Sequence, residues 1–146
     1  MISSSLVSFS YSILRDISSL QSIYVSSDNP YYSSVDGLLC LKESSSLIYY
    51  PQGKAEVEYS IPISIRFILE NSFVNCTYLE IITINSTVES IEEGAISNCS
   101  GIHQINYGVE TLTDGFIKNS GTSDGYSIRF YNDAYFVSSY SYTNDP

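Results

Sequence analysis

Few side chains in this sequence of 146 residues could catalyse a reaction or hold a metal, since it has three cysteines and one histidine. Cys40, Cys76 and Cys99 lack the C-x-x-C or H-x-x-x-H spacing that a zinc site uses. His103 has no nucleophile and orienting acid at a spacing that suggests a catalytic triad, so we expect it at the surface. The sequence therefore predicts no catalytic residues, no metal site and no cofactor.

Cys76 and Cys99 occupy the same position in successive copies of an apolar repeat. Strand-like stacking of the copies would bring their Cα atoms to about 5 Å, which is within the range for a disulfide. Parallel neighbours direct their Cβ bonds alike, however, and this geometry favours a reduced, buried pair over a disulfide. Cys40 is also expected to be buried, and an odd cysteine count fits a reducing or neutral setting better than a disulfide scaffold.

Three Asn-x-Ser/Thr sequences begin at Asn75, Asn85 and Asn98, and they could accept glycans if the chain enters a secretory pathway. Asn75 and Asn98 also occupy one position of the repeat, where Asp16 stands in the first copy. Short polar side chains that bond to nearby backbone are typical of turns. Turn formation is therefore the preferred interpretation, and glycosylation is the alternative.

One pattern of seven apolar residues occurs three times along the chain. Its copies are Leu6, Phe9, Leu14, Ile17, Leu20, Ile23 and Val25, then Ile65, Ile68, Phe73, Cys76, Leu79, Ile82 and Ile84, then Val88, Ile91, Ile96, Cys99, Ile102, Ile105 and Tyr107. The second and third copies are contiguous and keep a constant step in the numbering (88−65 = 23, 107−84 = 23). A period in the twenties with one short strand per unit is typical of a leucine-rich-repeat solenoid, in which each coil buries its apolar residues against the next.

Each copy ends in a short segment in which residues such as Ile82 and Ile84 alternate with Thr83, as in a strand with one buried face. Stacked coils would align these strands as a parallel sheet, about 4.8 Å apart. The opposite side, from Phe73 to Leu79, spaces its apolar residues three apart, which suits a tight helical turn. The expected fold class is a strand-dominated α/β leucine-rich-repeat solenoid, with a parallel sheet on one wall and short helical or 3-10 turns on the other.

The middle of the chain departs from the repeat period. The gap from Val25 to Ile65 (65−25 = 40) is much larger than the gap between contiguous copies (88−84 = 4). The surplus of 36 residues (40−4 = 36) equals one added coil of 23 residues plus about 13 more (36−23 = 13). Asp36-Gly37 favours a tight turn before the apolar run 38–41, and residues 47–50 form a second strand-like run. These features predict a hairpin insert at about residues 29–58.

The repeat pattern also decays after Tyr107. Val109, Leu112 and Phe116 arrive two positions early (109−107 = 2 against 88−84 = 4), and the aromatic-rich run 126–131 indicates a final irregular coil. We therefore expect a single leucine-rich-repeat domain over residues 1–146, with the insert and an irregular terminal coil at about 117–146.

The composition limits the classes of partner. A formal net charge of −10 and a pI near 4.2 oppose nucleic-acid binding, and the six Lys and Arg residues are scattered. No run of about 18 apolar residues occurs, so we expect no membrane insertion by this segment. The N-terminus lacks a basic segment followed by an apolar block, so no secretion signal is expected in these residues and the localisation stays unknown.

Together these features resemble the BspA-type leucine-rich-repeat family of surface antigens in anaerobic bacteria, which is also expanded in parasitic protozoa. The matching pieces are Phe73-x-x-Cys76-x-x-Leu79-x-x-Ile82-x-Ile84, Val88-x-x-Ile91, Asn29-Pro30-Tyr31-Tyr32, Asp36-Gly37-x-Leu39, Tyr50-Pro51-x-Gly53-Lys54 and Tyr59-x-Ile61-Pro62. The resemblance runs from about Leu6 to Phe116. It implies a right-handed, strand-lined solenoid that adheres to host proteins, matrix or other cells without catalysis, at the cell surface or in secreted form.

The strand-lined wall is the predicted binding surface, because successive coils place side chains there in a regular array. Its expected members are Ser22, Tyr24, Glu58, Ser60, Ile81, Thr83, Gln104 and Asn106. A polar face interrupted by Tyr24 and Ile81 could combine apolar anchors with surrounding hydrogen bonds. The predicted function is non-enzymatic protein binding by an adhesin or surface-antigen fragment, with a host or matrix protein as partner. The alternative is an intracellular leucine-rich-repeat scaffold.

Overall fold

Strands dominate the computed structural model, which describes residues 1–108, 116–118, 126–132 and 135–142. Within them the helical element is the six-residue 3-10 helix η1 (Tyr11–Asp16). The strands are β1 (Tyr32–Val35), β2 (Leu38–Leu41), β3 (Ser46–Tyr49), β4 (Glu58–Ser60), β5 (Phe67–Ile68), β6 (Phe73–Val74), β7 (Ile81–Ile84), β8 (Ser90–Ile91), β9 (Ile96–Ser97), β10 (Gln104–Tyr107), β11 (Ile117–Lys118), β12 (Tyr126–Asn132) and β13 (Tyr135–Tyr142).

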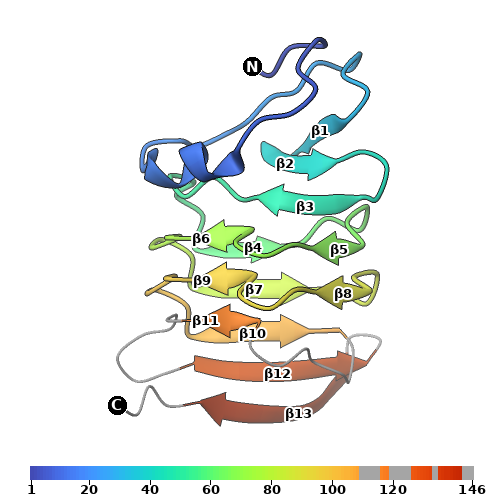
Figure 1. Ribbon diagram of the computed structural model, residues 1–146. Coiled ribbons are helices and arrows are strands. Elements are labelled where there is room, and N and C mark those ends of the chain that lie inside the picture. Colours follow the sequence, from blue (N-terminus) through green and yellow to red (C-terminus); the bar gives the residue numbers. More distant parts are fainter. Residues whose placement is uncertain (109–115, 119–125, 133–134, 143–146) are drawn as a thin grey trace.

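The two contiguous repeat units, residues 65–84 and 88–107, each contribute one strand to each of three sheets (Figure 1). Strands β5, β6 and β7 pair in parallel with β8, β9 and β10, always at the same offset (90−67 = 23, 96−73 = 23 and 104−81 = 23). We call β13-β12-β10-β7-β4 the broad sheet, β1-β2-β3-β5-β8 the insert sheet and β11-β9-β6 the narrow sheet. The register predicted from the repeat step is confirmed for these two units.

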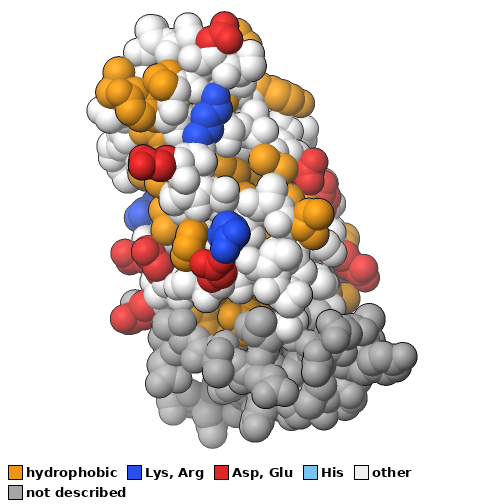
Figure 2. All heavy atoms as spheres, turned by 90° about the vertical axis from the view of Figure 1, so that its right-hand side faces the viewer, with side chains coloured by type: hydrophobic (Ala, Val, Ile, Leu, Met, Phe, Trp, Pro, Cys, Tyr) orange, Lys and Arg blue, Asp and Glu red, His pale blue; other side chains and the backbone are white. Residues whose placement is uncertain are grey.

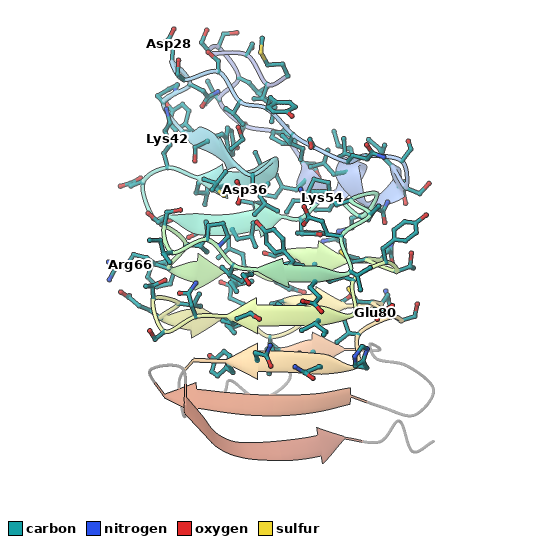
Figure 3. All side chains as sticks on the ribbon, turned by 180° about the vertical axis from the view of Figure 1, so that it is seen from behind. Asp28, Asp36, Lys42, Lys54, Arg66 and Glu80 are labelled. Atoms are coloured by element: carbon teal, nitrogen blue, oxygen red, sulfur yellow. The ribbon has the colours of Figure 1, made fainter. Side chains whose placement is uncertain are left out.

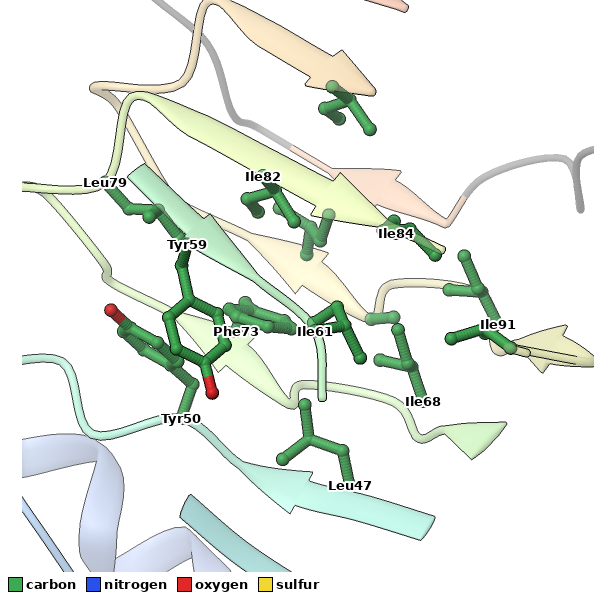
Figure 4. Packing of buried hydrophobic residues seen from close by; sticks show 14 of the residues in the cluster. Leu47, Tyr50, Tyr59, Ile61, Ile68, Phe73, Leu79, Ile82, Ile84 and Ile91 are labelled. Atoms are coloured by element: carbon green, nitrogen blue, oxygen red, sulfur yellow. The ribbon is translucent and has the colours of Figure 1, made fainter. Parts of the chain in front are cut away.

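The repeated apolar residues of both units meet in one main hydrophobic cluster, part of which is shown in Figure 4. Leu79, Ile82 and Ile84 of the first unit belong to it, as do Ile102 and Ile105 of the second, and none of them is more than 1 % exposed. Burying a large aliphatic side chain contributes about 1.5–3 kcal/mol. This cluster is therefore the main source of stability in the repeat units.

The wall opposite the broad sheet lacks, in both repeat units, the helical or 3-10 turns that the apolar spacing predicts. Phe73 begins strand β6, and the chain then bends at Asn75, whose φ of 57° is left-handed. Asn98, the equivalent residue of the next unit, has a φ of 54°. A left-handed residue cannot continue a right-handed helix. The helical wall is therefore wrong for the repeat units, and so is the α component of the expected class, since the described residues contain no α-helix.

The region between the first apolar copy and the repeat units forms the antiparallel strands β1, β2 and β3, and β3 continues in parallel with β5. Asp36 and Gly37 join β1 to β2 with φ angles of 52° and 78°, both positive as in a type I′ hairpin turn. Leu38 and Cys40 belong to the main cluster, whereas Leu39 belongs to a second one. The insert sheet therefore has two apolar faces to bury.

Residues 1–25, which we call the N-terminal cover, pack on the second apolar face. The second cluster joins Ile23 of the cover to Tyr32, Leu39, Ile48, Tyr49 and Val74, with Ile2, Phe9, Tyr11, Leu14, Leu20 and Val25 half-buried around it. Within the cover, Val25 makes an isolated parallel bridge with Ile2. The prediction that this segment forms a first coil in register is wrong, because the insert offers it a different apolar surface.

Beyond the repeat units the broad sheet continues into β12, which pairs in parallel with β10 at the repeat offset (127−104 = 23). Strand β13 then pairs antiparallel with β12. In the narrow sheet, β11 pairs with β9 at a smaller offset (117−96 = 21), which matches the shortened spacing in the sequence. Phe116 is buried in the main cluster, whereas Val109 and Leu112 lie outside the described residues.

Candidate protein-binding surface

Six of the eight predicted binding residues form two columns across β4, β7 and β10 of the broad sheet. The first column is Glu58, Ile81 and Gln104, and the second is Ser60, Thr83 and Asn106, each member being the Cα partner of the next. Figure 3 views the molecule from the side of this sheet. Because neighbouring strands lie about 4.8 Å apart, one extended partner segment could contact every member of a column.

Hydrogen bonds between side chains order part of this surface. The Gln104 Nε2 donates to Asn106 Oδ1 at 2.8 Å, and the Asn106 Nδ2 donates to Thr83 Oγ1 at 3.0 Å. Inward-facing residues alternate with these polar ones, since Ile82 and Ile105 are fully buried in the main cluster. The surface is therefore a fixed polar array on a well-packed support.

A third column at the start of these strands was missed by the sequence prediction. Its members are Val57, Glu80 and His103, again at the repeat step (80−57 = 23 and 103−80 = 23). The Glu80 backbone N–H donates to the Val57 carbonyl at 2.8 Å, and that of His103 to the Glu80 carbonyl at 3.0 Å. His103 is exposed, as predicted, with its Nδ1 3.9 Å from Glu80 Oε2. Applying the repeat step one residue before the first column would have identified these positions.

Ser22 and Tyr24 lie apart from the columns. The intervening Ile23 donates its backbone N–H to the Gly37 carbonyl at 2.8 Å, so this segment follows the β1–β2 turn instead of pairing with β4. A Cβ on Gly37 would approach Ser22 Oγ to 2.8 Å, and Tyr24 is 64 % exposed. The expectation that both residues share the broad sheet is wrong, because residues 22–24 lie against the β1–β2 hairpin. Their role in binding stays a prediction.

Lys54 lies beside the β4 edge of the broad sheet and is held by the chain itself. Its Nζ is 3.4 Å from Glu56 Oε1 and donates to the Asp36 carbonyl at 3.0 Å. The same ammonium lies 5.9 Å and 6.0 Å from the ring centres of Tyr50 and Tyr59. Cation–π contacts of this kind add to the ion pair, so Lys54 is fixed at the edge and is not available to a partner.

The three cysteines are buried and form no disulfide in the structure. Burial raises the pKa of the Cys40 thiol to about 12. A hydrogen bond with Cys99, together with burial, raises the pKa of Cys76 well above its usual range. Because the thiolate is the reactive form, Cys40 and Cys76 are poor nucleophiles and poor metal ligands in the folded chain.

The three Asn-x-Ser/Thr sequences all occur at bends of the backbone. Asn75 and Asn98 have the left-handed φ angles that asparagine tolerates, which supports the turn interpretation. The Asn85 side chain accepts a hydrogen bond from the Thr87 backbone N–H at 3.0 Å and donates to the Ile61 carbonyl at 2.6 Å. Asn85 therefore links the ends of β7 and β4, and glycosylation of any of the three stays a prediction.

The described residues contain no group of three or more His, Cys, Asp or Glu arranged to hold a metal ion. In that same part of the chain, no helix is both long enough and apolar enough to span a bilayer. The feature that repeats on the surface is the array of columns on the broad sheet.

The parallel strand register and the stacked columns define a strand-dominated repeat protein. The chain belongs to the family described as the BspA type leucine rich repeat region, since six copies of that family's model match residues 52–144. No curated protein matches the sequence.

Solved structures of bacterial leucine-rich proteins share this fold. A leucine rich cell surface protein from Faecalibacterium prausnitzii A2-165 is 27 % identical, with a TM-score of 0.56, covering 64 % of this chain and 25 % of that one. A leucine-rich repeat protein from Eubacterium ventriosum ATCC 27560 is 22 % identical, with a TM-score of 0.57, covering 75 % and 36 %. The chain therefore spans well under half the length of these two proteins.

Proposed function

We propose that this chain is a non-enzymatic, protein-binding part of a leucine-rich-repeat solenoid, with residues 1–146 acting as one domain. The observation that carries the proposal is the regular array of side chains across β4, β7 and β10. Protein interfaces combine a few apolar anchors with a polar rim. Ile81 is half-buried in the middle of the first column and would be the anchor, with the hydrogen-bonded amides of Gln104 and Asn106 beside it.

In this proposal the chain is an adhesin or surface-antigen fragment whose partner is a host or matrix protein. Membership of the family supports a surface role, as does the similarity to a protein described as a leucine rich cell surface protein. An intracellular scaffold is the second candidate. It is favoured by three buried cysteines that form no disulfide, because chains in oxidising compartments more often pair their cysteines.

The test of binding through the broad sheet is affinity capture with the intact chain as bait. Candidate partners are captured with the wild-type chain, identified by mass spectrometry and then measured by titration. Replacing Ile81 with Ser should weaken binding while leaving the melting temperature nearly unchanged. The matched control is Thr77→Ala, because Thr77 is exposed on the far side of the same unit. Equal affinities for the wild type and Ile81→Ser would contradict the proposal.

A further inference from the structure

Two carboxylates, Glu58 and Glu80, belong to the columns of the broad sheet, and no Lys or Arg lies on β4, β7 or β10 beside them. Glu58 is exposed, and the Glu80 side chain is 50 % exposed at the start of β7 (Figure 3). Lys54, the cation beside β4, has a side chain that is only 10 % exposed and is held by Glu56. The local charge of these three strands is therefore negative, as is that of the whole chain.

Other basic residues of the described region lie elsewhere. Lys42 Nζ donates to the backbone carbonyls of Ser27, at 2.8 Å, and Asn29. Arg66 forms an ion pair with Glu89 on the side of β5 and β8. Figure 2 shows that side, where Lys and Arg side chains stand apart from one another.

The broad sheet does hold one arginine, on β12. Arg129 is the Cα partner of Asn106. Glu58 belongs to the first column and Glu80 to the third, and both lie on the far side of β10 from β12. The basic group beside Glu80 is His103, whose Nδ1 lies 3.9 Å from Glu80 Oε2, and no Lys or Arg lies on β4, β7 or β10, so a basic partner can still pair with Glu58 and Glu80.

The hydrogen-bonding groups of the surface point to the same partner chemistry. The Gln104 side-chain amide donates to Asn106, and the Asn106 side-chain amide donates to Thr83, so each amide uses one N–H donor within the surface. Ionised carboxylates, such as those of Glu58 and Glu80, only accept hydrogen bonds. Acceptors therefore outnumber free donors among these side chains, and a complementary partner must supply hydrogen-bond donors.

Apolar side chains lie between the carboxylates. Val57 is 48 % exposed, and its carbonyl accepts the backbone N–H of Ile81 at 3.1 Å, so the two residues adjoin. Glu58 is the Cα partner of Ile81, and Glu80 immediately precedes it. Lys and Arg bury their aliphatic stems on apolar surface while the charged end stays in a polar setting. This arrangement of Val57, Ile81, Glu58 and Glu80 matches such a side chain in both shape and charge.

We infer that the broad sheet docks a basic, extended segment of its protein partner. Lys or Arg stems lie on Val57 and Ile81, and the charged ends reach Glu58 and Glu80, where an Arg can bind a carboxylate through two hydrogen bonds. The inference rests on the proposed function and adds the chemistry of the partner to it.

The first experiment is an NMR titration of the intact chain with a short capped peptide of alternating Lys and Val. A peptide of alternating Glu and Val is the matched probe of opposite charge. The Lys peptide should bind and shift the backbone amides of residues 57–60, 80–84 and 103–106, and the Glu peptide should not. Equal binding of the two peptides, or shifts confined to another surface, would overturn the inference.

Paired charge variants separate local recognition from general attraction to an acidic protein. Glu58→Gln with Glu80→Gln should weaken Lys-peptide binding about threefold to tenfold, the range for losing two exposed ion pairs. Glu43→Gln with Glu70→Gln removes the same charge from exposed residues outside the broad sheet and should leave the affinity unchanged. An equal loss in both double variants would show non-specific attraction and overturn the inference.

Ile81→Ser distinguishes the inference from the proposed function. If Ile81→Ser weakens capture of the protein partner while the Glu58 and Glu80 changes do not, the surface is correct and its preference for a basic segment is wrong. If neither change alters capture of the partner, the proposed function fails together with the inference.

Discussion

The N-terminal cover and the repeat unit 88–107 carry the same apolar pattern but are buried to very different degrees. Ile102 is fully buried, whereas its equivalent Leu20 is half-buried. Cys99 is also fully buried, whereas its equivalent Ile17 is 42 % exposed. The repeat unit has paired strands in all three sheets, but the cover packs against one apolar cluster, formed by the insert together with Leu69 and Val74. An apolar pattern thus predicts which residues tend to be buried. How completely they are buried depends on how many other elements pack around them.

Different interactions hold the two regions in place. The repeat unit is held by its strand pairing and the main cluster. The cover depends more on individual side-chain hydrogen bonds, above all those of the fully buried Asn29, whose Nδ2 donates to the carbonyls of Ser3 and Leu6 at 2.8 and 2.9 Å. The Tyr49 hydroxyl adds a bond to the Leu14 carbonyl at 2.8 Å. Stability in the cover should therefore be sensitive to single polar substitutions.

The largest expected difference between the regions comes from placing a charge at apolar positions of the repeat pattern. Leu79→Asp or Ile102→Asp should unfold the domain, because an unpaired buried charge is far more unfavourable than the ~1.5–3 kcal/mol gained from burying a large apolar side chain. Ile17→Asp, in the cover, and Thr83→Asp, on the outer surface, should be nearly silent. Circular dichroism melting curves measure all four. Similar melting temperatures for the four variants would show that the two regions are not buried differently.

Alkaline pH should destabilise both hydrophobic clusters. Burial raises the pKa of Cys40, in the main cluster, from 9.0 to about 12, and that of Tyr49, in the second cluster, from 10.0 to about 12. A folded pKa above the unfolded one means that the stabilisation is complete below about pH 9 and is lost as the pH rises towards 12. Urea unfolding at stepped pH should show this fall, and Tyr49→Phe should lose less stability over the same range. A free energy of unfolding that stays constant from pH 9 to 12 would contradict the burial of these groups.

Substituting Asn29 should affect the cover more than the repeat units. Asn29→Ala removes the bonds to Ser3 and Leu6 and those that its Oδ1 accepts from the backbone N–H groups of Tyr31 and Tyr32. Leaving such groups unsatisfied should lower the free energy of unfolding by about 1–3 kcal/mol. Hydrogen exchange should accelerate in residues 1–25 and stay slow in β7 and β10. Uniform acceleration along the chain would mean that the cover and the repeat units unfold as one.

The smallest effect concerns the thiols, which should be nearly inert in the native chain. Cys40, Cys76 and Cys99 should react slowly with a thiol reagent while folded, because each is buried. Denaturation without reductant should then release all three. Release of one thiol would reveal a disulfide and would point to an oxidising compartment.

Much of the repeat geometry could be predicted from the sequence because it depends on local spacing. The repeat step placed Ile82 opposite Ile105 and Thr83 opposite Asn106, and both pairs are Cα partners in the structure. The turn at Asp36-Gly37 was predictable from its residue types. Six of the eight surface residues follow directly from this register.

Other features depend on competition between surfaces, which spacing does not report. The pattern from Leu6 to Val25 matched the other copies, yet the segment packs on the insert because Leu39, Ile48 and Tyr49 create a second apolar face there. For the same reason Ser22 and Tyr24 do not lie on the broad sheet. The turn wall was mispredicted for a different reason, since apolar spacing of three residues fits both a helical turn and a bend. The recurring Asn75 and Asn98 were the signal for left-handed bends.

The most direct test of the account is hydrogen–deuterium exchange of the intact chain with and without its captured partner. Because the broad sheet is the proposed binding surface and the cover has a structural role, the two regions serve as internal controls for each other. We expect new protection in residues 57–60, 80–84 and 103–107, and none in residues 1–25. Protection confined to the N-terminal cover or to the β1–β2 hairpin, with the broad sheet unchanged, would contradict the account.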